Sequence, residues 1–135
     1  MNAYATYTCT RATLEEGINA GNDVPCYSRN TDTAGLHYQR GAWAFDLSST
    51  HLTRQFADDA NTVQENRTGD LGLIPGYRTW NTQLKWKVPG QPGLELLAGV
   101  NNLADKRFFT RTSDGNLGKM VGAPRMAYVQ GPLIF

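Results

Sequence analysis

Apolar and polar residues alternate strictly between Thr79 and Val88. The larger and more apolar side chains of this stretch are Trp80, Thr82, Leu84, Trp86 and Val88. The residues between them are polar or charged, namely Asn81, Gln83, Lys85 and Lys87. A period of two predicts a β-strand with one apolar face and one polar face. Tryptophan near both ends of the apolar face is typical of a strand that crosses a bilayer, where indole rings lie at the two interfaces.

The same period recurs along the chain and predicts an all-β fold of about six strands. Trp43, Phe45 and Leu47 form the apolar face of one of these strands. Glycine, proline, asparagine and aspartate separate the apolar stretches, and no long helical period survives between them. The predicted strands are residues 3–13, 33–39, 42–56, 79–88, a strand that begins at Leu94, and residues 126–135.

Long and short connections alternate between the predicted strands. Arg40-Gly41 and residues 89–93 are short turns. The other connections, of which 57–76 and 110–122 are examples, are long. This rhythm predicts an antiparallel up-and-down meander that forms part of a transmembrane β-barrel, with long loops outside the cell and short turns in the periplasm. The lipid-facing anchors that we expect are Trp43, Trp80, Trp86 and the terminal Phe135.

The composition is compatible with a membrane protein that crosses the bilayer by strands. The 135 residues carry a net charge of +1 and no basic stripe, so we expect no nucleic-acid partner. No apolar run approaches the roughly 20 residues of a membrane helix. The N-terminus lacks a charged region followed by an apolar stretch and is therefore no signal peptide. Because an exported protein needs one upstream, we expect this chain to be a fragment.

The two cysteines, Cys9 and Cys26, lie on either side of a long polar segment. In an oxidising envelope they could form a disulfide across this segment. They could equally stay free thiols, since sequence spacing does not give the geometry of a bridge. A metal site is not expected here, because no second ligand lies at the required spacing.

Several motifs resemble those of TonB-dependent outer-membrane receptors. Residues 99–109, which contain Asn102-Leu103-Ala104-Asp105, resemble the Asn-Leu-Phe-Asp segment before the last loop of that family, with Ala104 in place of its phenylalanine. Gly122-Ala123-Pro124-Arg125 resembles the Gly-x-Pro-Arg that opens the final strand, and Pro75-Gly76-Tyr77 resembles an earlier strand opening. Phe109-Thr110-Arg111 with Gly118 and Gly122 is most similar to ferric-citrate-type receptors.

This resemblance implies that residues 1–135 are one partial domain, the last six strands of a barrel with about 22 in all. It implies a Gram-negative outer-membrane receptor that takes up a ferric siderophore or ferric citrate, and it implies no further cofactor. The bilayer, a plug domain and an energy-coupling inner-membrane complex would be its partners in the intact protein. The polar residues Asn81, Gln83, Lys85 and Glu95 would then face the plug or the water path.

An anionic iron chelate would be held by cationic and hydrogen-bonding side chains at the mouth of the barrel. The last long loop offers such groups, and our expected ligand contacts are Asn116, Arg111, Asp114, Arg107 and Lys119. Asn116 is the first choice, because an amide can donate to a carboxylate without adding charge. The alternative is an ordinary solvated polar loop. Arg54 and Gln55 have a weaker claim to the same role.

The sequence favours a transport receptor over an enzyme. The acidic pair Asp58-Asp59 begins a loop and has neither the spacing of a calcium loop nor that of paired catalytic carboxylates. His37 and His51 are expected on opposite strand faces and do not form a site. The main alternative to a receptor segment is a soluble small barrel or sandwich that binds a small ligand, with the tryptophans in its core.

Overall fold

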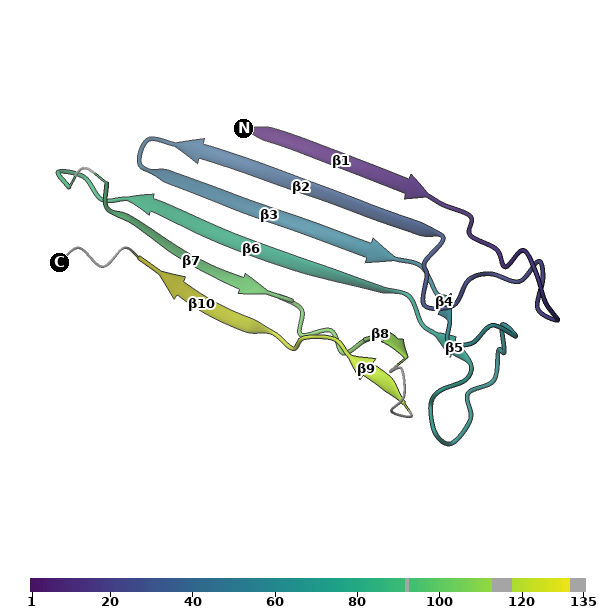
Figure 1. Ribbon diagram of the computed structural model, residues 1–135. Helices are drawn as coiled ribbons and strands as arrows, with labels where there is room; N and C mark the ends of the chain where they lie inside the picture. Colours follow the sequence, from purple (N-terminus) through teal and green to yellow (C-terminus); the bar gives the residue numbers. More distant parts are fainter. Residues whose placement is uncertain (92, 113–117, 132–135) are drawn as a thin grey trace.

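The computed structural model describes residues 1–91, 93–112 and 118–131 of the chain. Six strands form one antiparallel sheet in the order β1-β2-β3-β6-β7-β10 (Figure 1). They are β1 (Asn2–Cys9), β2 (Asn30–Arg40), β3 (Trp43–Leu52), β6 (Tyr77–Lys87), β7 (Glu95–Asn101) and β10 (Met126–Gln130). Two small hairpins accompany them, β4 (Gln55–Phe56) with β5 (Leu73–Ile74) and β8 (Phe109–Thr112) with β9 (Lys119–Val121). The predicted six-stranded meander is confirmed.

Strand boundaries differ from the prediction where loop residues take over backbone hydrogen bonds. The strand predicted for 42–56 ends as β3 at Leu52, because Gln55 and Phe56 pair instead with β5. The strand predicted for 3–13 ends at Cys9, and Thr13 keeps only an isolated bridge to Asp23. Residues 132–135, which include the expected anchor Phe135, lie outside the described residues.

The cross-strand register places the apolar residues on one face of the sheet. Trp43 lies opposite Trp86, and Phe45 lies opposite Leu84. The rings of Trp43 and Trp86 stack with their centroids 5.2 Å apart. Since side chains of opposite residues point to the same face, the predicted phasing of these two strands is confirmed.

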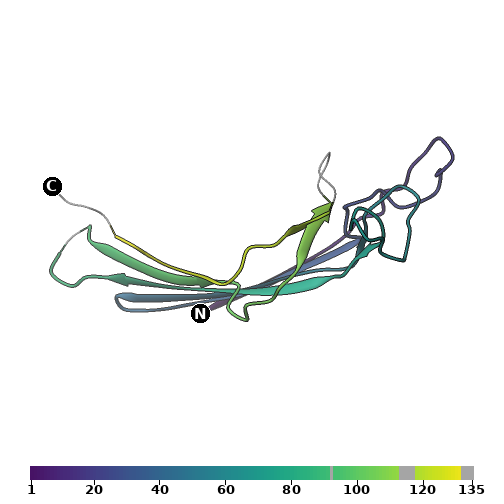
Figure 2. The same ribbon diagram turned by 90° about the horizontal axis from the view of Figure 1, so that it is seen from below.

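This apolar face is uncovered in the chain. The sheet is one curved layer in side view (Figure 2). Trp43 is 48% exposed and Leu84 is 40% exposed. The buried hydrophobic residues of the described chain are Ala57 and Ile74, both in the long connection between β3 and β6. The alternative of a soluble sandwich or closed small barrel is therefore wrong, because it requires the tryptophans to pack in an interior.

The opposite face carries polar groups and two tyrosines that lie over glycines. Tyr128 lies opposite Gly99 and Tyr4 lies opposite Gly35. A Cβ atom at Gly99 would lie only 2.5 Å from Cζ of Tyr128 and 2.9 Å from a backbone oxygen of Thr82. Glycine at these positions lets each ring lie flat on the strand beside it.

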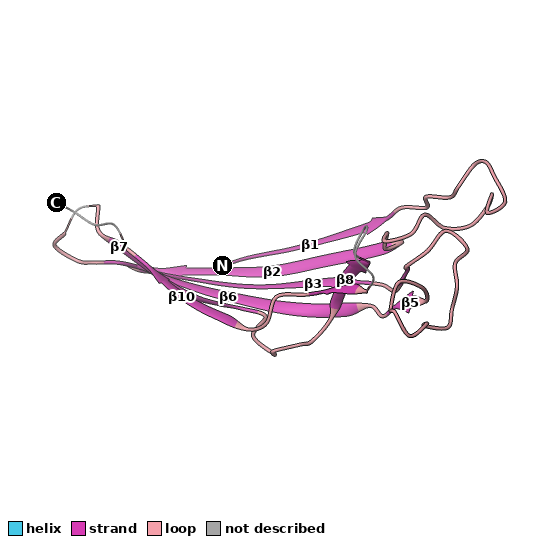
Figure 3. Cartoon of the chain, turned by 60° about the horizontal axis from the view of Figure 1, so that its bottom comes forward, coloured by secondary structure: helices cyan, strands magenta, loops and turns pink. Residues whose placement is uncertain are grey.

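The two ends of the sheet differ in their connections. Short turns join the strands at one end, where Gly41 takes a positive φ of 57° in the turn between β2 and β3. The long loops leave the other end, as Figure 3 shows together with the small β5 and β8 strands. In the described part of the chain, no helix is long and apolar enough to cross a membrane.

Candidate binding site at the loop end of the sheet

Three long connections meet at one end of the sheet. We call them the first long loop (residues 10–29), the second long loop (residues 53–76) and the third long loop (residues 102–125). Figures 1 and 2 show that they gather beyond the strand ends and that hairpin β8–β9 rises toward the concave side of the sheet. They are the part of the molecule that can enclose a ligand.

Asn61 joins the first long loop to the second. Its amide nitrogen donates to the backbone oxygen of Asp23 at 2.8 Å, and its side-chain oxygen accepts from the Asp23 amide at 2.7 Å. Asn61 adopts a left-handed backbone with a φ of 54°, which asparagine tolerates better than most residues. The Cys26 amide adds a second link by donating to the backbone oxygen of Phe56 at 2.7 Å.

Gln55 joins the second long loop to the third. It is buried, and its amide donates to the backbone oxygen of Thr110 at 2.5 Å. Thr112 extends this contact, since its hydroxyl donates to the backbone oxygen of Ala57 at 3.4 Å. Gln55 is therefore a structural link between loops, and its weaker claim to ligand binding stays a prediction.

Lys119 is a second link between these loops. Its side chain is only 3% exposed, and its ammonium lies 3.0 Å from Glu65 Oε1. The same group donates to the backbone oxygen of Leu73 at 3.4 Å and lies 5.7 Å from the centroid of the Phe109 ring. Within this chain the charge of Lys119 is covered and paired, and its role as a ligand contact stays a prediction.

Asn102 fixes the base of the third long loop. This buried residue takes a φ of 50°, and its amide donates to the backbone oxygens of Lys106 at 2.9 Å and Ala123 at 3.0 Å. Its side-chain oxygen accepts from the backbone N–H of Lys106. The backbone N–H of Asn102 donates to Asn81 Oδ1. Asp105 acts similarly by accepting from the Arg125 amide at 3.0 Å. The Asn-Leu-x-Asp motif therefore has a structural role, since its side chains hold the two ends of the third long loop together.

A hollow of about 540 Å³ opens beside the Asn-Leu-x-Asp motif. Lys106 and Arg107 supply cationic groups to its lining, and both are exposed. Phe108, Phe109, Val121 and Pro124 supply apolar walls, and the acidic Asp105 also lines the hollow. The ring of Phe108 stacks on the ring of Tyr77, with their centroids 4.0 Å apart. Such a hollow suits an anionic ligand that also has apolar surface.

The expected ligand residues are distributed differently around this hollow. Arg107 lines it directly. Arg111 is exposed on β8, where its Nε lies 3.2 Å from Sδ of Met120 on the facing strand. The first choice, Asn116, and its neighbour Asp114 lie outside the described residues.

Both cysteines are free thiols in the structure. Cys9 is exposed at the end of β1, opposite Asn30. Cys26 is half-buried, and its Sγ lies 3.1 Å from the hydroxyl of Thr112. Because Cys26 is turned toward the third long loop, the structure follows the free-thiol alternative and not the disulfide.

The sequence did not predict the linking roles of Asn61 and Gln55. Their hydrogen-bond partners lie 38 and 55 residues away. The structural role of Asn102 could have been predicted, since an asparagine just after an alternating strand often hydrogen-bonds the backbone of a turn. The acidic residue Asp58 has a structural role, because it accepts hydrogen bonds from Thr62 and from the Gly72 amide.

The chain matches a known protein family and several solved structures. Residues 1–103 match the family described as "TonB dependent receptor-like, beta-barrel". Among solved structures, the ferric citrate transporter FecA in its unliganded form is 39% identical, with a TM-score of 0.88. The match covers 96% of this chain and 20% of the FecA chain.

Two more distant structures share the fold. The ferric-catecholate import receptor Fiu of E. coli K12, in its closed form, is 16% identical over 96% of this chain and 18% of its own, with a TM-score of 0.72. The ferric yersiniabactin uptake receptor FyuA of Yersinia pestis is also 16% identical, over 94% of this chain and 20% of its own, with a TM-score of 0.71. This chain thus spans about a fifth of each of these three proteins.

Proposed function

This chain belongs to the TonB-dependent receptor β-barrel family, and from that membership we propose that it is a barrel segment of an outer-membrane receptor for ferric citrate or a related ferric siderophore. The observation that carries the proposal is the single-layer sheet, which has an uncovered apolar face and a polar face. A strand of this kind needs hydrocarbon on one side and water on the other.

The apolar face supports a position against lipid. Trp80 and the stacked Trp43 and Trp86 lie toward opposite ends of this face, at the levels where aromatic belts lie in membrane barrels. Between them the face presents residues such as Phe45 and Leu84. Trp43, Trp80 and Trp86 are therefore proposed as the lipid-facing anchors, and Phe135 is proposed as a further one.

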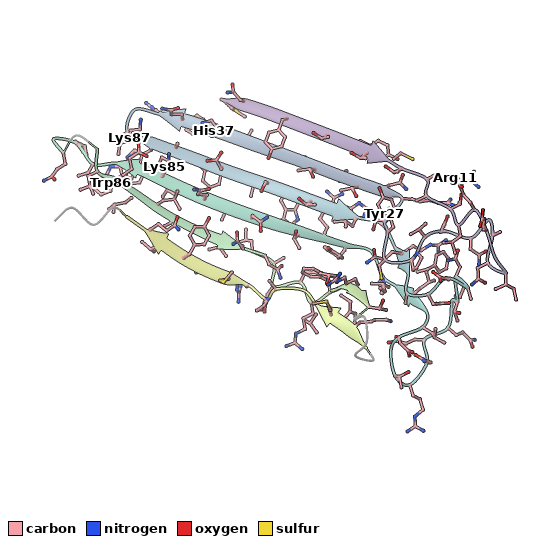
Figure 4. The ribbon with its side chains drawn as sticks, in the orientation of Figure 1. Arg11, Tyr27, His37, Lys85, Trp86 and Lys87 are labelled. Atoms are coloured by element: carbon pink, nitrogen blue, oxygen red, sulfur yellow. The ribbon has the colours of Figure 1, made fainter. Side chains whose placement is uncertain are left out.

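The polar face supports a position against water or another part of the receptor. His37 and Asp46 lie opposite each other, with Nδ1 and Oδ1 2.6 Å apart. Closer to the short turns, Lys85 and Lys87 both approach Glu95, at 3.1 Å and 3.6 Å. Figure 4 shows His37, Lys85 and Lys87 at the end of the sheet with the short turns. We propose that this face borders the plug domain and the aqueous path.

The hollow beside Asn102 is the proposed chelate contact of this segment. Lys106 and Arg107 provide positive charge, and Phe108 and Phe109 provide apolar contact. FecA, the solved relative at 39% identity, is a ferric citrate transporter. Ferric citrate carries carboxylates, which guanidinium groups bind through paired hydrogen bonds. Arg111, Asp114 and Asn116 stay predicted contacts nearer the tip of the third long loop.

The rest of the transport cycle would belong to the intact receptor. We propose that residues 1–135 are one partial barrel domain, since the chain spans 20% of FecA. A plug domain and an energy-coupling inner-membrane complex would complete the receptor in a Gram-negative outer membrane. TonB-dependent receptors transport their ligands, and the proposal therefore assigns this chain no catalytic reaction.

Binding to the intact receptor tests the proposal. Lys106→Gln and Arg107→Gln should together weaken binding of ferric citrate by at least about tenfold, because each removes a charge-assisted hydrogen bond. Arg67→Gln is the matched control, since Arg67 is exposed in the second long loop and does not line the hollow. Unchanged ferric citrate binding in the double variant, or an equal loss in the control, would contradict the proposed site.

A further inference from the structure

Charged residues form a row across three strands just beyond Trp80 on the apolar face. Asp32 lies opposite His51, and His51 lies opposite Arg78. Asp32 Oδ1 lies 2.6 Å from Nδ1 of His51, and its Oδ2 accepts from Arg78 at 2.9 Å. The next row toward the short turns contains Trp80 opposite Ser49. The apolar band therefore ends abruptly at a charged boundary.

A hollow of about 590 Å³ lies beyond this row. Asn30, His51, Thr53 and Gly76 are among its lining residues. Asn30 and His51 lie at even spacing from Asp32 and Ser49 along their strands, so they share the face of the tryptophans. The hollow thus opens at the loop end of the apolar face, on the opposite side from the polar residues that we place against the plug.

The lining of this hollow contains two guanidinium groups and one carboxylate. The guanidinium groups belong to Arg29 and Arg54. Its acidic residue is Asp23, which pairs with Arg29 at 2.6 Å. Among the described residues, no carboxylate lies within salt-bridge distance of the exposed Arg54. Tyr27 adds an aromatic hydroxyl at the same place, near the end of the sheet shown at the right of Figure 4.

Cationic groups beside an apolar band suit an amphiphile rather than a small soluble anion. A guanidinium fork binds phosphate oxygens in a fixed geometry. Trp80 and the apolar rows lie on the inner side of the charged row that borders the hollow, and acyl chains would lie there. Tyrosine is favoured where apolar and wet surroundings meet. The headgroup would therefore lie in the hollow and the acyl chains against the apolar band, with the row of Asp32, His51 and Arg78 between them.

We propose that this hollow binds the phosphate-bearing headgroup of a lipid in the outer leaflet, with Arg54 as its principal contact and Arg29 and His51 beside it. The inference rests on the proposed function, because that function places the apolar face in the bilayer and the long loops outside the cell. It assigns the hollow to the lipid side of the barrel, whereas the proposed chelate contact is the separate hollow at Arg107.

The experiment uses the intact receptor in nanodiscs of phosphatidylcholine, with or without a minor fraction of phosphatidic acid. Lipid that stays bound after release into detergent is counted by native mass spectrometry. We expect phosphatidic acid to be retained, and Arg54→Gln to weaken its retention by about fivefold, since a partly exposed charge-assisted contact is lost. Arg67→Gln is again the matched control and should leave retention unchanged.

Equal retention in Arg54→Gln and the parent receptor would overturn the inference, as would an equal loss in Arg67→Gln. Inorganic phosphate is added in a separate arm. If it displaces phosphatidic acid at equal concentration, the hollow is a soluble-anion site and the lipid assignment is wrong. Ferric citrate binding, measured on the parent receptor, reports on the proposed function alone. Retained phosphatidic acid without ferric citrate binding would therefore overturn the function and support the lipid site.

Discussion

The ammonium group of Lys119 lies 3.0 Å from the carboxylate of Glu65, and this pair joins the third long loop to the second. The two partners are unequal, because the lysine side chain is 3% exposed and the glutamate side chain is 58% exposed. The stabilising effect therefore depends mainly on the buried lysine, which also contacts Leu73 and Phe109.

Lys119→Ala should destabilise the contact between the two loops by about 1–2 kcal/mol, since it removes a hydrogen bond and a cation–π contact together with the ion pair. Glu65→Gln should cost less than about 0.5 kcal/mol, as is usual for an exposed partner. Hydrogen exchange at Leu73 and Ile74 measures both effects in the intact receptor. Equal protection in the parent and Lys119→Ala would show that the lysine does not hold the loops.

Asn102→Ala should destabilise the receptor by about 2–3 kcal/mol, because three hydrogen bonds from the buried Asn102 side chain to backbone groups of Lys106 and Ala123 are lost. Asn102→Gly is the informative control, since glycine accepts the positive φ but makes no side-chain hydrogen bonds. Urea unfolding in detergent measures the free energy of unfolding of the parent and of both variants. If the glycine variant matched the parent, the hydrogen bonds would not be the source of stability.

Asp70 should make the second long loop sensitive to acid. Hydrogen bonds from Thr68 and then Asn66 hold the pKa of this carboxyl below its usual value. A lowered folded-state pKa means that the stabilisation is present above the unfolded-state pKa and is lost as pH falls through the folded-state pKa. Once the intrinsic exchange rate at each pH is divided out, the protection of the Gly69 and Leu71 amides should therefore fall in acid. Asp70→Asn should remove this pH dependence, and a parent loop insensitive to acid would contradict the assignment.

Leu84→Arg should impair insertion of the intact receptor, because Leu84 lies between the levels of Trp80 and Trp86 on the apolar face. A charge near the midplane of the lipid face costs about 2–4 kcal/mol. Gln83→Arg is the matched control, since Gln83 lies on the polar face opposite Asp46. Heat-modifiable mobility of the receptor in outer-membrane fractions measures assembly. Normal assembly of Leu84→Arg, or failure of both variants, would be inconsistent with the assigned faces.

The strands could be predicted from the sequence because their pattern is local. The alternation around Trp86 and Leu84 fixes which face is apolar, and the short turn at Gly41 fixes the pairing of β2 with β3. A slip of one residue would move every apolar side chain to the polar face. The register observed at Trp43 and Trp86 therefore follows from the pattern itself.

The loop contacts could not be predicted because they join residues far apart in sequence. Gln55 and Thr110 are 55 residues apart, and no local pattern relates the two. Lys119 resembled a ligand contact for the same reason, since only the folded chain shows Glu65 and Leu73 beside it. Arg107 lines a hollow beside the Asn102 motif, and its contact with a ligand stays a prediction.

Spin labels placed one at a time at residues 83 and 84 of the intact receptor test the central claim, after replacement of Cys9 and Cys26 by serine. In reconstituted bilayers, the label at Leu84 should collide with oxygen, which concentrates in hydrocarbon, and should be protected from a water-soluble nickel chelate. The label at Gln83 should show much lower oxygen accessibility. Nickel accessibility at residue 84 that equals or exceeds that at residue 83 would contradict the position of this face against lipid.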